Sequence, residues 1–147
     1  MQRVDFHVLP SAETRERLHY ACRVVEKAYL AGQRVLVWFD GVVDLQTFDE
    51  MLWTYSAGSF VPHEVLAGEP DWEDAPVWLG AAHPAPSACD VLINLAAAIP
   101  PAADRAQRVI EIIDADDGRR QAGRARFRGY RERGVEPVTH TIGAAAS

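Results

Sequence analysis

The sequence predicts an α/β fold, namely a three-layer α/β/α sandwich with a mostly parallel sheet. Short apolar runs alternate along the chain with segments whose apolar residues recur every three to four positions. This alternation of strand-like and helix-like patterns is typical of a sheet covered by helices on both faces. The 147 residues, 48% of them hydrophobic, suit one domain over residues 1–147.

The first strand is expected at residues 4–9, where Pro10 stops the apolar run. Ser11 or Thr14 is expected to cap the next helix, because hydroxyl groups accept hydrogen bonds from free amides at a helix start. Gly32 suits the end of this helix, where the chain often turns left-handed. The apolar side chains that repeat along it are Leu18, Cys22, Val25, Ala28 and Tyr29.

A second strand and helix follow. Residues 34–39 are apolar after the first position, which predicts a strand buried on both faces. A second amphipathic helix is expected to end near Gly58. Its apolar side chains are Phe48, Met51, Leu52 and Tyr55.

The middle of the chain is less regular. Residues 59–76 contain proline, glycine and acidic residues and predict irregular structure, whereas residues 76–79 predict a short strand. Residues 83–87 contain two prolines and predict a loop. Residues 90–95 predict another buried strand, closed by Pro100-Pro101.

The C-terminal part predicts a strand at residues 108–113, then a helix that runs to about Arg133 and stops at Gly134, and a last strand at residues 138–142. Negative charge is favourable at a helix start. The acidic residues at this start are Asp114, Asp116 and Asp117. A Mg²⁺ site is the alternative interpretation, but capping explains the three carboxylates with fewer assumptions.

Composition and spacing exclude several classes of protein. No stretch approaches the ~20 apolar residues of a membrane span, and the N-terminus lacks the apolar core of a secretory signal. Cys22 and Cys89 form no CxxC pair, and the five histidines are scattered. We therefore expect a cytoplasmic protein without membrane partner, metal or other cofactor.

Motifs of nucleotide and hydrolase chemistry are absent from the chain. It contains no GxxxxGK[ST] loop, no GxGxxG and no GxSxG. The first strand runs into Leu9-Pro10-Ser11 rather than into a glycine-rich turn that phosphate can approach. We therefore expect a binding module without catalytic activity, although fold class alone never settles function.

Charge is distributed unevenly. The net charge is −6, yet residues 119–133 hold seven arginines and one glutamate, and the rest holds eight basic and twenty acidic residues. An acidic body with one basic segment is unlike a general nucleic-acid binder. It indicates a protein that receives one anionic partner at one place.

The basic helix combines cationic and aromatic side chains. Helical spacing puts four of them on one stripe: Arg120, Arg124, Phe127 and Arg131. A second cationic row consists of Arg119, Arg126 and Arg133. A solvated helix face explains the charges alone. An aromatic ring among arginines instead offers an apolar floor with cationic walls, which suits a peptide that carries a carboxylate and an aromatic ring.

Three aromatic residues are candidates to complete this floor: Trp53, Tyr55 and Phe60. Packing in the core is the alternative interpretation, because aromatic residues at helical spacing are usually interior. Phe60 lies in a predicted loop, where an aromatic side chain has less reason to be buried.

Several stretches, in order along the chain, resemble the chi subunit family of bacterial DNA polymerase III. The most distinctive is residues 48–54 (Phe-Asp-Glu-Met-Leu-Trp-Thr) followed by residues 59–63 (Ser-Phe-Val-Pro-His). The other stretches are residues 6–9, 21–29, 32–37, 90–95, 108–114 and 124–131 with Gly134. The resemblance covers essentially the whole chain.

The resemblance implies a fold like that of nucleotide hydrolases without the phosphate-binding loop, and a non-catalytic accessory role in the clamp loader of the DNA polymerase III holoenzyme. It implies two partners in DNA replication, namely the acidic, phenylalanine-terminated C-terminal tail of single-stranded DNA-binding protein and the psi subunit. A repair helicase is a further candidate partner. Direct contact with nucleic acid is not expected.

Carried over by motif, the tail-binding residues are Trp53, Phe60, Arg120, Arg124, Phe127 and Arg131, with Thr139 nearby. Arg124 or Arg131 would hold the terminal carboxylate through a bidentate contact. Phe127, Trp53 and Phe60 would pack against the terminal phenylalanine ring. The aspartates upstream would be attracted by three arginines: Arg119, Arg120 and Arg128. Phe127 stands where some chi proteins have tyrosine, which removes a hydroxyl hydrogen bond.

Two other functions stay open from the sequence. A direct single-stranded nucleic-acid-binding domain would follow phosphates with the arginine helix and stack bases on aromatic rings, although the acidic remainder of the chain argues against it. A degenerate nucleotide-binding enzyme would keep affinity for its ligand despite the missing phosphate loop.

Overall fold

Seven parallel strands form one sheet in the computed structural model, which describes residues 1–56, 58, 60–81 and 88–143. These strands are β1 (Arg3–Val8), β2 (Val35–Trp38), β3 (His63–Val65), β4 (Val77–Gly80), β5 (Cys89–Asn94), β6 (Ala106–Ile113) and β7 (Val138–Thr141). Their order across the sheet is β3–β4–β2–β5–β6–β1–β7, so β3 and β7 form opposite edges. The predicted α/β class is confirmed, and every strand pairing is parallel.

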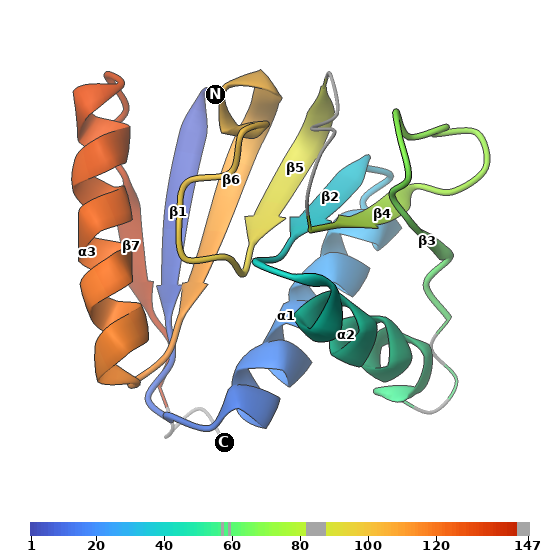
Figure 1. Cartoon of the computed structure of the whole chain (residues 1–147), viewed down its shortest axis with the longest axis horizontal. Coiled ribbons are helices and arrows are strands. Elements are labelled where there is room, and N and C mark those ends of the chain that lie inside the picture. The colour runs from blue at the N-terminus through green and yellow to red at the C-terminus, as the bar shows by residue number, and fades with distance from the viewer. Residues whose placement is uncertain (57, 59, 82–87, 144–147) are drawn as a thin grey trace.

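Helices cover both faces of the sheet (Figure 1). α1 (Thr14–Leu30) and α2 (Val42–Thr54) pack on one face, and α3 (Asp117–Glu132) packs on the other, beside β1 and β7. A short 3-10 helix, η1 (Ala103–Arg105), precedes β6. These are the three layers that the sequence predicts. Within the described part of the chain, no helix is long and apolar enough to cross a membrane.

The strands feed two apolar cores by turning alternate side chains to opposite faces. In β2, Val35 and Val37 pack under α1 and α2, while Leu36 and Trp38 pack on the α3 side. Cys22 is fully buried within the predicted stripe of α1, as expected for a core residue. Uninterrupted apolar strands are therefore explained by cores on both faces.

Some local predictions need correction. α1 begins after Glu13, and neither Ser11 nor Thr14 caps it; Ser11 Oγ instead accepts a hydrogen bond from the Glu13 amide. β3 lies within the stretch predicted as irregular, because three residues are too few to show a pattern and pairing with β4 defines them. The predicted loop at residues 83–87 lies outside the described residues. Gly32 and Gly134 end their helices with φ of 77° and 87°, as predicted.

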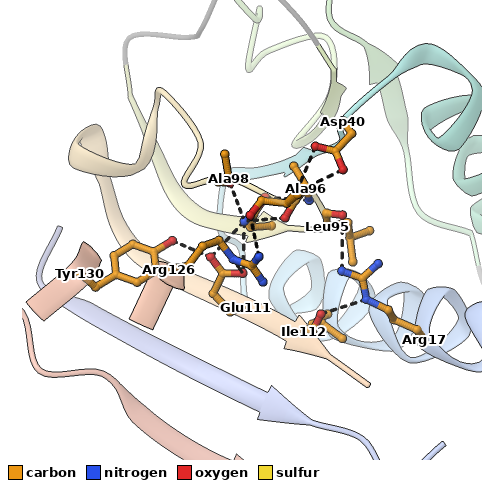
Figure 2. Close-up of polar contacts among 11 residues, drawn as sticks. Arg17, Asp40, Leu95, Ala96, Ala98, Glu111, Ile112, Arg126 and Tyr130 are labelled. Carbon is orange, nitrogen blue, oxygen red and sulfur yellow. Dashed lines mark hydrogen bonds and ion pairs between the residues drawn. The ribbon is translucent and has the colours of Figure 1, made fainter. Parts of the chain in front are cut away.

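A buried polar network fixes α3 on the sheet (Figure 2). Glu111 of β6 accepts hydrogen bonds from Tyr130 Oη at 2.6 Å, Arg126 Nε at 3.0 Å and Asn94 Nδ2 at 3.0 Å. Burial raises the pKa of Glu111, and these three donors oppose that rise. Because Arg126 and Tyr130 point inward, Arg124 and Phe127 of the same helix lie beside Thr139 and Thr141 of β7.

Close packing also holds α3 near the sheet. A β-carbon at Gly123 would collide with Ile113 Cδ1, and one at Gly129 would lie 2.7 Å from Ile99 Cδ1. Glycine at these positions therefore lets the helix backbone approach the core, which a larger residue would prevent.

Candidate functional site

A groove of about 430 Å³ runs between α3 and the edge strand β7. Its lining residues come from four elements and are Phe6, Val8, Ile113, Arg120, Gly123, Arg124, Phe127, Thr139 and Thr141. The floor is apolar, and the rim carries guanidinium and hydroxyl groups. We call this feature the α3–β7 groove.

Alternate residues of β1 and β7 form part of the floor and one wall of the α3–β7 groove. Phe6 and Val8 of β1 pair in register with Thr139 and Thr141 of β7, so all four side chains face α3. β7 has a neighbour on one side only, which leaves the two threonines at the rim uncovered. Gly123 adds no side chain, so the groove stays open above Ile113.

A hydrogen bond on the opposite face anchors the β7 wall to β1. His140 Nε2 lies 2.8 Å from Asp5 Oδ1, and Asp5 is fully buried. Arg108 and Arg3 also donate to this carboxylate, at 2.9 Å and 3.2 Å. Burial alone would raise the pKa of Asp5, but the bonds from His140, Arg108 and Arg3 hold it below its ordinary value. The position of Thr139 thus depends on a hydrogen bond between the neighbouring His140 and a buried carboxylate on the other face of the sheet.

Phe127 lies half-buried in the groove floor. Its ring centroid is 5.3 Å from that of Phe6, with the planes tilted by 53°. The guanidinium of Arg131 lies 5.1 Å from the Phe127 centroid. The ring is therefore packed on one side and reachable from the groove, as the predicted apolar floor requires.

The predicted arginines of this stripe differ in what they already bind. Arg131 donates from Nε and Nη2 to Glu136, at 2.9 Å and 2.7 Å, and lies outside the groove lining. Arg120 Nε donates to the Asp114 carbonyl at 3.1 Å. Arg124 is exposed and, among the described residues, makes no hydrogen bond or ion pair. Arg124 is thus the groove guanidinium with no competing acceptor.

The three arginines of the predicted second cationic row are each paired with a carboxylate. Arg119 pairs with Asp114 at 2.7 Å, Arg126 with Glu111 at 3.0 Å and Arg133 with Asp104 at 3.1 Å. The three positions do follow one another along α3, but each meets a carboxylate from another segment. These ion pairs could not be predicted from helical spacing, because the acidic partners lie outside the helix and up to 29 residues away in the sequence.

The acidic residues at the start of α3 act as the capping interpretation predicts. Asp116 is the N-cap and accepts a hydrogen bond from the Arg119 amide at 2.9 Å. Burial alone would raise the pKa of Asp114, but bonds from Arg119 and the Asp116 amide hold it below its ordinary value. Over the described ranges, no group of three or more histidine, cysteine or acidic side chains is arranged to hold a metal ion.

Trp53 and Phe60 do not share a pocket with Phe127, which corrects the single site predicted from the sequence. Trp53 lies in the last turn of α2 with its ring against His63 of β3, and Phe60 precedes β3. β3 forms the edge of the sheet opposite β7 (Figure 1). Helical and loop patterns in the sequence carry no information on the order of strands in the sheet. The sequence analysis therefore assigned aromatic residues from both edges to one binding site.

Trp53 and Phe60 form a separate aromatic surface, which we call the Trp53 patch. Their ring centroids are 5.3 Å apart, and the Trp53 ring is 4.0 Å from that of His63. His63 is fixed by Asp49 at 2.8 Å and by the Val61 carbonyl at 2.7 Å. Trp53 and Phe60 are 43% and 65% exposed, so the patch is open to a partner. Sequence analysis found both residues but missed His63 as their support.

Comparison with known proteins agrees with the earlier resemblance. The family model described as "DNA polymerase III chi subunit, HolC" matches residues 1–138. A protein of Pseudomonas aeruginosa named DNA polymerase III subunit chi is 38% identical over 142 residues, which cover 97% of this chain and 98% of that protein. A protein of Escherichia coli strain K12 with the same name is 30% identical over 146 residues, with coverages of 96% and 99%.

Proposed function

Because the chain belongs to the DNA polymerase III chi subunit family, we propose that it is a non-catalytic accessory subunit that bridges the clamp loader to single-stranded DNA-binding protein. It would do so in the cytoplasm, at replication forks. The observation that carries the proposal is the α3–β7 groove, where the Phe127 ring and the unengaged Arg124 lie in one concave site.

The groove suits the end of an acidic peptide whose last residue is phenylalanine. An incoming ring would lie on the apolar floor made by Phe6, Ile113 and Phe127. The α-carboxylate of this terminal phenylalanine is close to its own ring. With the ring on the floor, the carboxylate would therefore lie at the rim of the groove. Arg124 can receive it through two parallel N–H bonds, which guanidinium groups make well with carboxylates.

Further arginines near the groove favour the acidic residues upstream in the peptide. Arg120 lines the groove, and among the described residues its guanidinium is bound only to a backbone carbonyl. Arg128 is exposed on α3. Attraction between exposed charges is screened by salt. Arg119 no longer belongs to this set, because it lies outside the groove lining and reaches Asp114 instead.

The Trp53 patch supports a second partner, which we assign to psi. A bridging protein needs two surfaces, and β3 and β7 place them on opposite edges of the sheet. Aromatic side chains exposed together are enriched at protein interfaces. The same patch is the candidate for a repair helicase, in which case the helicase and psi would compete.

Calorimetric titration of the full chain with two versions of one acidic peptide tests the groove. The peptide ends in phenylalanine, as a free acid in one version and as an amide in the other. We expect the free acid to bind with a micromolar constant, about −8 kcal/mol, and the amide to bind more weakly. Equal affinities would contradict the assignment of the carboxylate to Arg124.

A further inference from the structure

A second cavity, of about 470 Å³, lies at the carboxyl ends of β2 and β5 and shares no residue with the α3–β7 groove. From β2 the chain proceeds toward the β3 edge, and from β5 it proceeds toward the β7 edge. The order of strands therefore reverses between these two neighbours. In open parallel sheets, small ligands bind outside the strand ends at this point.

Arg17 of α1 reaches into this carboxyl-edge cavity although it is only 7% exposed. Its Nε donates to the Ile112 carbonyl at 2.9 Å and its Nη2 to the Leu95 carbonyl at 3.4 Å (Figure 2). Both acceptors are neutral, so no carboxylate neutralises Arg17 by contact. Within the described residues Nη1 makes no hydrogen bond, and no buried side-chain polar atom lacks a partner, so Nη1 opens on the cavity.

Two more guanidinium groups line the same wall. Arg126 is 4% exposed and donates from Nε and Nη1 to Glu111 and the Ala97 carbonyl. Arg119 donates from Nε and Nη2 to Asp114. Burial, together with the positive charges of Arg119 and Arg126, lowers the pKa of Arg17 to about 10, while the charges of Asp114 and Glu111 oppose part of that fall. An anion beside Arg17 Nη1 would stabilise this buried charge.

The lining also carries acceptors. Asp40 accepts two contacts from the Ala97 amide, at 3.0 Å and 3.1 Å, and Asp116 caps α3 beside Arg119. Asp44 and Thr47, in the first two turns of α2, also line the cavity and are exposed. These carboxylates would repel a bare anion. A phosphate ester with hydroxyl groups would give its hydroxyls to them, as ribose does to an acidic residue in nucleotide-binding sheets.

We propose that the carboxyl-edge cavity binds a small hydroxyl-bearing phosphate ester, up to the size of a nucleoside monophosphate. Its phosphate would lie on Arg17 Nη1 and on the N–H groups that Arg119 and Arg126 do not give to their acceptors among the described residues. The volume lies within the range of small-ligand sites. The proposal is independent of the peptide groove, because the two sites are built from different residues.

Titration of the isotope-labelled full chain with inorganic phosphate, ribose 5-phosphate and AMP, followed by NMR, tests the proposal. We expect saturable shifts at the amides of residues 14–18 and 95–97, with both esters binding more tightly than phosphate. Arg17→Gln should weaken the esters by about tenfold or more. Arg124→Ala, in the other site, should leave their affinity unchanged.

A second variant keeps the test decisive if Arg17→Gln does not fold. Ala122→Leu narrows the cavity and leaves every arginine in place, so it should abolish ester binding while the acidic peptide still binds. The proposal is overturned if the esters cause no saturable shifts, or if both variants bind them as the natural chain does. Binding that requires Mg²⁺ would also overturn it, since the phosphate is assigned to guanidinium groups alone.

Discussion

The guanidinium of Arg131 lies over the ring of Phe127, 5.1 Å from its centroid, while the same guanidinium is bound by Glu136. One face of the ring is thereby shielded by a cation whose charge is already matched. Glu136 raises the pKa of Arg131, and Arg131 lowers that of Glu136, as expected for a formed pair. The two arginines that the sequence left as alternatives for carboxylate binding are therefore not equivalent.

Replacement of Arg124 by alanine should weaken binding of the free-acid peptide by about 1–3 kcal/mol, because it removes a charged hydrogen-bond donor from the groove. Arg131→Ala should weaken peptide binding less than Arg124→Ala does, because Glu136 already matches the charge of Arg131. Arg133→Ala, which loses only the pair with Asp104, is the control. Calorimetry on the three variants gives the ranking, and equal losses for Arg124→Ala and Arg131→Ala would contradict it.

Peptide binding should depend on an aromatic ring at position 127, whether that ring belongs to phenylalanine or to tyrosine. Phe127→Tyr keeps the ring and adds a hydroxyl at the open side, so peptide affinity should be kept or improved. Phe127→Ala removes the floor and should cost about 2 kcal/mol or more, as central aromatic contacts do. Fluorescence anisotropy with a labelled peptide measures both. An alanine variant that folds and binds normally would place the peptide elsewhere.

The two surfaces should be separable by mutation. Phe60→Ala, at the Trp53 patch, should leave peptide affinity unchanged and weaken capture of psi, because the patch lies at the edge opposite the groove. Arg124→Ala should do the reverse. Pull-down of purified psi beside the peptide titration checks both variants. Loss of peptide binding in Phe60→Ala would contradict two separate surfaces and favour the single binding site predicted from the sequence.

Removal of the Tyr130 hydroxyl should destabilise the fold. Tyr130→Phe deletes the 2.6 Å hydrogen bond to the buried Glu111 carboxylate, a bond of a kind worth about 1.5–3 kcal/mol. Tyr29→Phe, at a partly buried tyrosine on the other core, should change the free energy of unfolding by less than about 0.5 kcal/mol. Urea denaturation compares the two, and similar values would show that the network contributes nothing.

Acid should weaken the anchor of β7. The pKa of Asp5 is lower in the fold than its ordinary value of 3.8, so its charge stabilises the fold above that value and the gain is lost as pH falls through the folded pKa. Asp5→Asn should therefore be destabilised at pH 7, and its gap to the natural chain should shrink below about pH 4. Denaturation curves at several pH values measure the difference in free energy of unfolding between Asp5→Asn and the natural chain. Asp74→Asn, at an exposed aspartate, should show almost none.

Apolar runs and helical spacing predicted most of the strands and helices, because each of these patterns depends only on residues close together in the sequence. The apolar run at residues 34–39 became β2, buried on both faces, and the arginine-rich helix ended at Gly134 as expected. β3 was missed because a three-residue strand depends on its neighbour β4 rather than on its own sequence. The cap of α1 was misplaced because Ser11 binds a nearby amide outside the helix.

The candidate site was predicted in its helical half only. Spacing along α3 placed Arg120, Arg124 and Phe127 on one side, and the groove contains all three. What α3 faces depends on strand order, which is non-local, so the sequence could not separate Trp53 from Phe127. Nor could it show that Glu136 engages Arg131, since a bond across a turn leaves no periodic signal.

The placement of β3 and β7 at opposite margins has a consequence for assembly. The α3–β7 groove and the Trp53 patch share no residue, so two partners bound as we propose would not compete for the same side chains. The chain would then tether one partner to the other, and each bound partner would raise the effective concentration of the other.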